Sequence, residues 1–206
     1  MMPVMDGIEL TRKIKDSEDY AQLPVVMLTA KTTDEDKNVG YEMGADAYIT
    51  KPFRMGDLKL RIDSIIRNRE RIRRKFMAQT DFKVEEQHYS SPDELFVQKA
   101  IECVKQHLDN SEYDREQFAS DMCVSSSTLY NKLRALTGQS VTGFINSIRL
   151  KEACRIMRQR PDIKMTELSM EVGFNTPKYF TKLFKKEFEM LPSEFISSLD
   201  SSREES

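Results

Sequence analysis

The chain has 206 residues and a formal net charge of −2 at pH 7, with 39% hydrophobic and 32% charged residues. Seven glycines and seven prolines argue against a turn-rich all-β fold, and no apolar run approaches the roughly 20 residues of a membrane span. The N-terminus also lacks the pattern of a signal peptide, so the expected location is cytoplasmic. The three cysteines, Cys103, Cys123 and Cys154, are odd in number and far apart. We therefore expect free thiols, no metal and no other cofactor in this chain.

The first part of the chain alternates helix and strand patterns. In chain order these are an amphipathic helix opened by Asp6 and Gly7 and ending near Asp16, a continuous apolar strand over 23–28, a helix over about 33–43, a strand over 45–50, and a long helix from about Met55. Such alternation predicts an α/β layer, but two parallel strands are too few to bury both faces of a sheet.

Three segments carry a resemblance to the second half of a two-component receiver domain: MMPVMDG at 1–7, MLTAK at 27–31 and MGADAYITKPF at 43–53. The resemblance implies that Thr29 is the hydroxyl at a strand end, Tyr48 the aromatic switch residue, and Lys51 the phosphate-contacting lysine before a cis bond to Pro52. The alternative is an unrelated α/β fragment with two buried strands.

The receiver resemblance also implies residues that these 206 do not contain. The phosphoacceptor aspartate would lie four residues before Pro3, and the acidic pair that binds Mg²⁺ would lie further upstream. We therefore expect Mg²⁺ only in a complete receiver, no phosphate transfer in this chain, and Thr29, Tyr48 and Lys51 as a receiver remnant. The native gene is expected to extend upstream, and a longer gene would supply a sensor kinase module.

A basic run, RNRERIRRK at 67–75, continues the last receiver helix. It is either a solvated helix face or a surface for phosphate contact or helix pairing. No hydrophobic period holds from 78 to about 90. We predict a partial receiver domain at 1–77 and a linker at 78–92.

The second domain is predicted to begin with a capping box at Ser91 to Glu94, with Pro92 at the first helical position. A helix follows it, then a second over 115–122, and a serine run then caps a third over about 126–136. Further on, Thr176 and Pro177 start a helix with phenylalanines on one face and lysines on the other. With the short helix before it and a tight turn at Gly173, this helix predicts a helix-turn-helix. An ordinary amphipathic surface helix is the alternative.

The two helix pairs are copies of each other. At an offset of 50, Phe118 and Met122 fall on Leu168 and Val172, and at 51 the later apolar positions coincide, with Leu129 on Phe180. This repeat predicts two helix-turn-helix units. A helix over 141–158, roughly 25 Å long, joins them, which is long enough to hold two recognition helices near one DNA turn of about 34 Å apart.

The region from about 93 to 196 resembles the AraC-type DNA-binding domain. The motifs are IRLKEACRIM at 148–157, MTELSMEVGF at 165–174 and YFTKLFKKEF at 179–188. Glu189 and Leu191 depart from the family's usual glycine and hydroxyl residue, and Val141 from its common proline. The expected fold is mostly α: an incomplete α/β, flavodoxin-like receiver fragment, then an all-α domain at 93–198 with two helix-turn-helix units and a disordered tail at 199–206.

Charge is distributed unevenly over the second domain. Between 115 and 196 there are 13 lysines and arginines against 9 acidic residues, and the two predicted recognition helices, 126–136 and 177–186, contain no acidic residue. Short polar and basic side chains suit base edges in a major groove, and those one turn further along suit phosphates. The predicted base contacts are Ser127, Thr128, Asn131, Lys178, Thr181 and Lys182, and the predicted phosphate contacts are Arg134, Lys185 and Lys186. Each could instead be a solvated surface residue.

The function predicted from these patterns is a sequence-specific transcription regulator of a two-component phosphorelay, with double-stranded DNA as its partner. The alternative is a signalling or dimerisation module that forms a homodimer through the receiver remnant. An enzyme is not expected, because no nucleophile–base pair, glycine-rich phosphate loop or metal cluster is evident.

Overall fold

The computed structural model describes residues 5–17, 20, 23–30, 45–78 and 91–204. They divide into two compact units, one of residues 1–77 with 124–140 and the other of residues 78–123 with 141–206. We call these the N-terminal and the C-terminal unit and describe each by itself.

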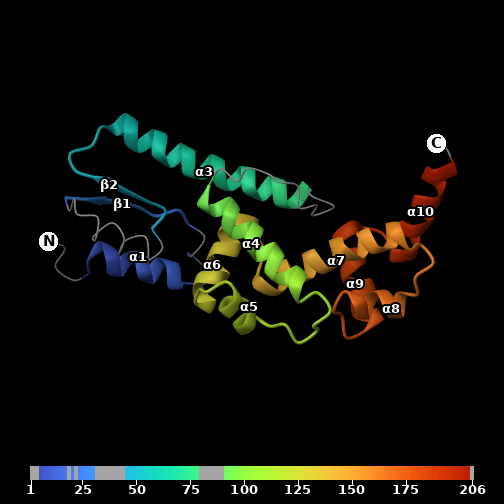
Figure 1. The fold of residues 1–206 in the computed structure, drawn as a ribbon. Helices are drawn as coiled ribbons and strands as arrows, with labels where there is room; N and C mark the ends of the chain where they lie inside the picture. Colours follow the sequence, from blue (N-terminus) through green and yellow to red (C-terminus); the bar gives the residue numbers. More distant parts are fainter. Residues whose placement is uncertain (1–4, 18–19, 21–22, 31–44, 79–90, 205–206) are drawn as a thin grey trace. The chain divides into compact units, whose positions relative to one another are not determined.

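Among its described residues, the N-terminal unit contains a two-stranded parallel sheet and three helices. Its elements are α1 (Gly7–Asp16), β1 (Val26–Thr29), β2 (Ala47–Thr50), α3 (Met55–Ala78) and α6 (Ser126–Thr137). The strands pair in register from Val26 with Ala47 to Thr29 with Thr50, and in Figure 1 they run between α1 and α3. The Lys51–Pro52 bond is cis, as the receiver resemblance implies. The helix predicted over 33–43 lies outside the described residues.

Strand β1 is shorter than the apolar run that predicts it. The amide of Leu23 donates to the carbonyl of Tyr20 in a turn, at 2.9 Å, and Pro24 has no amide hydrogen to give to a ladder. Pairing therefore begins only at Val26.

The apolar side chains of α3 are buried only at its C-terminal end. Ile72 and Phe76 are buried, whereas Ile62 and Ile66 are exposed, at 38% and 44%. A helix of 24 residues is about 36 Å long, whereas a four-residue strand spans only about 13 Å. Two such strands cannot cover the whole helix.

The C-terminal unit is entirely helical in its described part. Its helices are α4 (Pro92–Gln106), α5 (Arg115–Asp121), α7 (Val141–Gln159), α8 (Met165–Glu171), α9 (Pro177–Phe188) and α10 (Pro192–Glu204). A continuous core joins α7, α8 and α9, with Met157, Leu168, Val172, Phe180 and Phe184 all at 0% exposure. The predicted fold class, a small α/β fragment followed by an all-α region, is confirmed.

The repeat predicted from the sequence is present in the local structure. Helices α5 and α8 have seven residues each, and α6 and α9 have twelve each, at the offsets of 50 and 51. Ser125 and Thr176 cap α6 and α9 through equivalent side-chain hydrogen bonds to backbone amides. The same two backbone positions are left-handed in both copies: Cys123 and Gly173 in the turns, and Gly138 and Glu189 after the second helices.

Two differences from the predicted domain limits follow. Residues 124–140, predicted to belong to one domain over 93–198, fall in the N-terminal unit, where the Asn131 side chain donates to the backbone carbonyl of Lys15. Helix α10 also continues to Glu204, although 199–206 was predicted to be a disordered tail. No glycine or proline follows Pro192, so nothing in the sequence ends the helix at 198.

Lys151 is a charged side chain inside the C-terminal unit. It lies on α7, is 5% exposed, and has its pKa lowered to about 8 by burial, an effect that the charge of Glu187 on α9 partly opposes. On the same face of α7 the Ser147 hydroxyl donates to a carboxylate oxygen of Glu187 at 3.5 Å. Polar contacts from α7 thus reach the C-terminal end of α9.

The lowered pKa of Lys151 predicts a pH-dependent stability. Between pH 8 and the ordinary lysine pKa of 10.5 the unfolded chain binds more protons than the folded one, so stability rises with pH across this window, by up to about 3 kcal/mol. Lys151→Met should remove that rise and make the protein more stable at pH 7. Urea unfolding of both proteins between pH 7 and about 10 measures the difference. Parallel stability curves for the two proteins would show that Lys151 does not titrate as described.

Glu189 predicts a stabilising substitution. Its φ of 59° is in the left-handed region, where a side chain costs about 1 kcal/mol relative to glycine, and Gly138 occupies the same position after α6 with a φ of 77°. Glu189→Gly should therefore stabilise the protein by about 0.5–1 kcal/mol. Gly138→Ala is the matched control and should destabilise it. Thermal unfolding measures both, and a lower melting temperature for Glu189→Gly would contradict the conformational argument.

Candidate nucleic-acid interface

Helix α9 carries a cationic face because its other face is committed to the core. Thr176 caps it and Pro177 occupies the first turn, which fixes where the helix begins. Phe180 and Phe184 are fully buried. The side chains on the remaining face are exposed at Lys178, Lys182, Lys185 and Lys186, and half-buried at Thr181.

The α9 lysines form no ion pair with an acidic side chain in the part of the chain that the structure describes. Like charges on one helix face repel each other, and a bound anion would relieve this repulsion. The five predicted positions on α9 therefore lie on its outward face as expected, while their contacts with DNA remain predictions.

Aromatic packing holds α9 in place. The rings of Phe180 and Phe174 lie 5.5 Å apart between centroids, and Phe184 lies 4.6 Å from Phe188 and 5.9 Å from Phe195 on α10. Contacts of this kind stabilise beyond the area they bury and prefer defined geometries. The direction of the lysine face follows from this packing.

Helix α6 presents a more polar face, part of which is already hydrogen-bonded. Ser127 and Thr128 are exposed, but the Thr128 hydroxyl lies 2.8 Å from the capping hydroxyl of Ser125. Arg134 is exposed, donates to the Tyr130 hydroxyl at 2.6 Å and stacks over its ring at 5.8 Å. Tyr130 thus orients the predicted phosphate-contacting side chain.

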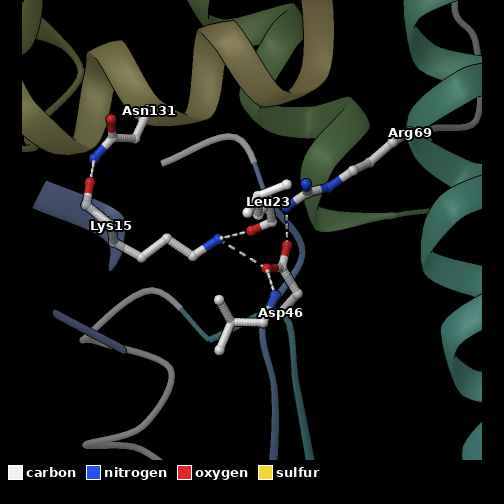
Figure 2. A network of polar contacts seen from close by, with 6 residues as sticks. Lys15, Leu23, Asp46, Arg69 and Asn131 are labelled. Atoms are coloured by element: carbon white, nitrogen blue, oxygen red, sulfur yellow. Dashed lines mark hydrogen bonds and ion pairs between the residues drawn. The ribbon is translucent and has the colours of Figure 1, made fainter. Parts of the chain in front are cut away.

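Asn131 is the predicted site residue whose surroundings differ most from the expectation. Figure 2 shows its amide nitrogen donating to the backbone carbonyl of Lys15, at the end of α1. No local sequence pattern indicates this contact, because the two residues are 116 positions apart. In this structure the Asn131 amide is not available to a base edge.

A second feature that the sequence did not predict is the network around Asp46. Its carboxylate accepts from the Lys15 ammonium at 2.9 Å and the Val25 amide at 2.8 Å, and it also pairs with Arg69 of α3 (Figure 2). These side chains are only 12–15% exposed. The sequence pattern that could have pointed to this network is an aspartate directly before an apolar strand. The network connects α1, both strands and α3.

The receiver remnant is assembled in part. Thr29 ends β1, and the backbone amide of Lys51, just after β2, donates to the Thr29 carbonyl at 2.7 Å. Both residues therefore lie at the carboxyl edge of the sheet, while Tyr48 pairs with Met27 further back. Asp46 lies before β2, at the opposite end, so its carboxylate does not face Thr29 and Lys51.

The described residues place limits on other kinds of site. Within them, no group of three His, Cys, Asp or Glu side chains could hold a metal ion. Cys103 and Cys154 are buried free thiols, and Cys123 is an exposed one. No helix in the described part of the chain combines the length and apolarity needed to cross a membrane.

Two protein families match the chain over separate ranges. Residues 118–198 match the helix-turn-helix domain family, and residues 1–63 match the response regulator receiver domain family. The first match spans both helix-turn-helix units from Phe118 onward. The second covers α1, both strands and the start of α3.

Relatives in other organisms match one or both parts. "Histidine kinase P4" of Formosa agariphila is 38% identical over 195 residues, which are 95% of this chain and 14% of that protein. The uncharacterized transcriptional regulatory protein YclJ of Bacillus subtilis is 48% identical over 67 residues, 32% of this chain and 28% of that protein. The chain thus spans between about a seventh and just over a quarter of the length of these relatives.

Among solved structures, a DNA-binding transcriptional dual regulator from Escherichia coli K-12 matches with a TM-score of 0.49 and 17% identity, over 56% of this chain and 99% of that one. The C-terminal domain of AraT, a response regulator from Geobacillus stearothermophilus, matches with a TM-score of 0.47 and 23% identity, over 52% and 88%. The two family matches show that the chain carries an AraC-type helix-turn-helix domain at residues 118–198 and part of a response regulator receiver domain at residues 1–63.

Proposed function

We propose that this chain is the DNA-binding output end of a two-component phosphorelay, and that α6 and α9 read two successive major-groove segments. The observation that carries the proposal is the exposed lysine face of α9, on the second helix of a helix-turn-helix. Such a face supplies both phosphate affinity and base-edge donors. Binding needs no metal or other cofactor, and the family is one of transcription regulators rather than enzymes.

The proposed roles follow the position of each side chain along its helix. Residues in the first two turns of a recognition helix reach base edges, and basic residues further along reach phosphates. The proposed base contacts are Ser127, Thr128, Asn131, Lys178, Thr181 and Lys182, with Arg134, Lys185 and Lys186 on phosphates. Asn131 would contact a base only after its amide leaves the Lys15 carbonyl. Lysine suits guanine and asparagine suits adenine. Helix α7, with 19 residues, is about 28 Å long and joins the first helix-turn-helix to the second along the chain.

The proposed signal input is a sensor kinase module. It is supported by the receiver match at residues 1–63 and by the similarity to a protein named as a histidine kinase. Thr29 and Lys51, at one edge of the sheet, would serve an aspartyl phosphate there, and Mg²⁺ would belong to a complete receiver. We expect no phosphate transfer from this chain, because the 206 residues do not include the phosphoacceptor aspartate that the receiver resemblance implies.

Exposed apolar side chains on α3 favour a second function, pairing of two chains through the receiver remnant. Leu60, Ile62 and Ile66 are 64%, 38% and 44% exposed. Apolar side chains that recur along one helix are typical of interaction surfaces. A pairing module without DNA binding would not need the lysine face of α9, so salt-dependent DNA binding distinguishes the two functions.

Binding to duplex DNA should weaken steeply with salt. Replacing one phosphate-contacting lysine should lower the slope of log K against log[salt] by about 1. We expect this for Lys185→Ala and Lys186→Ala, measured by fluorescence anisotropy on a random-sequence duplex. The control, Lys59→Ala on the exposed surface of α3, should leave the slope unchanged. Equal slopes for all four proteins would contradict a phosphate role for α9.

The base-contacting residues should determine sequence preference and not the fold. The double variant Lys182→Ala with Asn131→Ala should abolish preference for the duplex that the wild-type chain selects from a random library, with unchanged circular dichroism. Each lost base contact is worth about 1–3 kcal/mol of discrimination. Unchanged affinity and footprint for the double variant would rule out readout by both helices.

A further inference from the structure

Arg149, in the middle of α7, is a buried cation that the proposed DNA contacts leave unexplained. It is 5% exposed, and its guanidinium Nη2 donates to the backbone carbonyl of Asn110 at 2.6 Å. Its Nε is buried without a hydrogen-bond partner in the part of the chain described here. Burial lowers the pKa of Arg149. A buried charge with no carboxylate partner costs stability, so packing alone does not account for an arginine here.

Three segments meet at this guanidinium. Asn110 lies in the connection between α4 and α5, and the guanidinium carbon lies 5.9 Å from the ring centre of Phe174, in the turn between α8 and α9. A Cβ added to Gly173 in that turn would lie 2.9 Å from the guanidinium carbon and 2.2 Å from the carbonyl oxygen of Leu108. The α8–α9 turn therefore packs directly against both Arg149 and the α4–α5 connection.

We propose that Arg149 is a positioning residue for DNA readout, which sets the angle at which the turn before α9 meets the α4–α5 connection. A planar guanidinium can hydrogen-bond one segment at its edge while its face packs on a ring of another, and neither lysine nor an apolar residue can do both. Buried polar groups of this kind can fix one relative arrangement of packed elements at a cost in stability. The inference rests on the proposed function, because Arg149 would orient the lysine face of α9 toward DNA.

The test compares Arg149→Met and Arg149→Lys in the full chain, with Arg155→Met as the control. Arg155 lies on the same helix but is exposed, and it bonds to Glu152 and Gln159 on the surface. Methionine fills much of the space without a charge. Lysine keeps the charge and can reach the Asn110 carbonyl but lacks the planar face.

The first readout is DNA binding, with the duplex that the wild-type chain selects from a random library and the same duplex with one base pair inserted between its two halves. We expect wild type to bind the inserted duplex at least tenfold more weakly. Arg149→Met should bind the selected duplex at least tenfold more weakly than wild type and discriminate less against the insertion. Arg149→Lys should be intermediate, and Arg155→Met should be within twofold of wild type.

The second readout needs no DNA. Spin labels at Glu112→Cys and Lys182→Cys, in a Cys123→Ser background, report the distance between the α4–α5 connection and α9. We expect one narrow distance distribution for wild type and a distribution at least twice as wide for Arg149→Met. If Arg149→Met does not fold, Arg149→Lys decides both readouts.

The outcomes separate the positioning role from the proposed function. A folded Arg149→Met variant with wild-type spacing discrimination and an unchanged distance distribution would overturn the positioning role. If the wild-type chain selects no duplex at all, the proposed function fails, and the distance distribution alone then decides whether Arg149 positions α9.

Discussion

The packing of α9 against α7 is the constraint on which the candidate interface depends. Phe180 and Phe184 have no exposed surface, and each fully buried large apolar side chain contributes about 1.5–3 kcal/mol. Because these rings fix the rotation of α9 about its axis, they also fix which side chains face outward. The lysines on the opposite face are therefore oriented by apolar packing, and no ion pair within the described residues holds them. A helix positioned in this way can keep its charges for a ligand.

The two copies of the helix-turn-helix have diverged at the positions that shape their backbones. Asp114 caps α5 with a complete capping box, whereas the equivalent Lys164 makes no side-chain cap to α8. Glycine occupies the left-handed position in the turn of the second copy and after the second helix of the first copy, and Cys123 and Glu189 occupy the other two. The helix lengths are nevertheless identical. Burial of the equivalent apolar positions thus maintains the unit even where the local backbone preferences have been lost.

Most of the fold was predictable because its signals are local. Each of these signals affects only residues a few positions away. They are the helix caps at Ser91, Ser125 and Thr176, the turn glycine Gly173, and the apolar residues at helical spacing. Each amphipathic helix alone could have been an ordinary surface helix, and the repeat identified both as second helices of a helix-turn-helix. Two features of the helices were not predicted. Apolar residues of α3 are exposed because the short sheet offers little surface to pack on, and α10 continues to Glu204 because no helix-breaking residue follows Pro192.

The interactions that escaped prediction join residues distant in sequence. Asp46 binds Lys15 and Arg69 across 31 and 23 positions, and Arg149 reaches Asn110 across 39. Hydrophobic periodicity does not indicate which distant residues meet, and in the sequence each of these residues looks like an ordinary charged surface position. The same holds for Asn131, whose outward placement on α6 was expected but whose bond to Lys15 was not. The candidate site was thus predictable as a set of exposed side chains, and the interactions that orient it were not.

The most direct test of this account is a hydroxyl-radical and methylation footprint of the full chain on the duplex it selects. Two recognition helices reading one face of the duplex should protect two major-groove segments whose centres lie about 10–10.5 base pairs apart. A single protected segment would show that only one of the two helix-turn-helix units reads DNA. Protection of the phosphates without any protection of major-groove guanines would contradict sequence readout altogether.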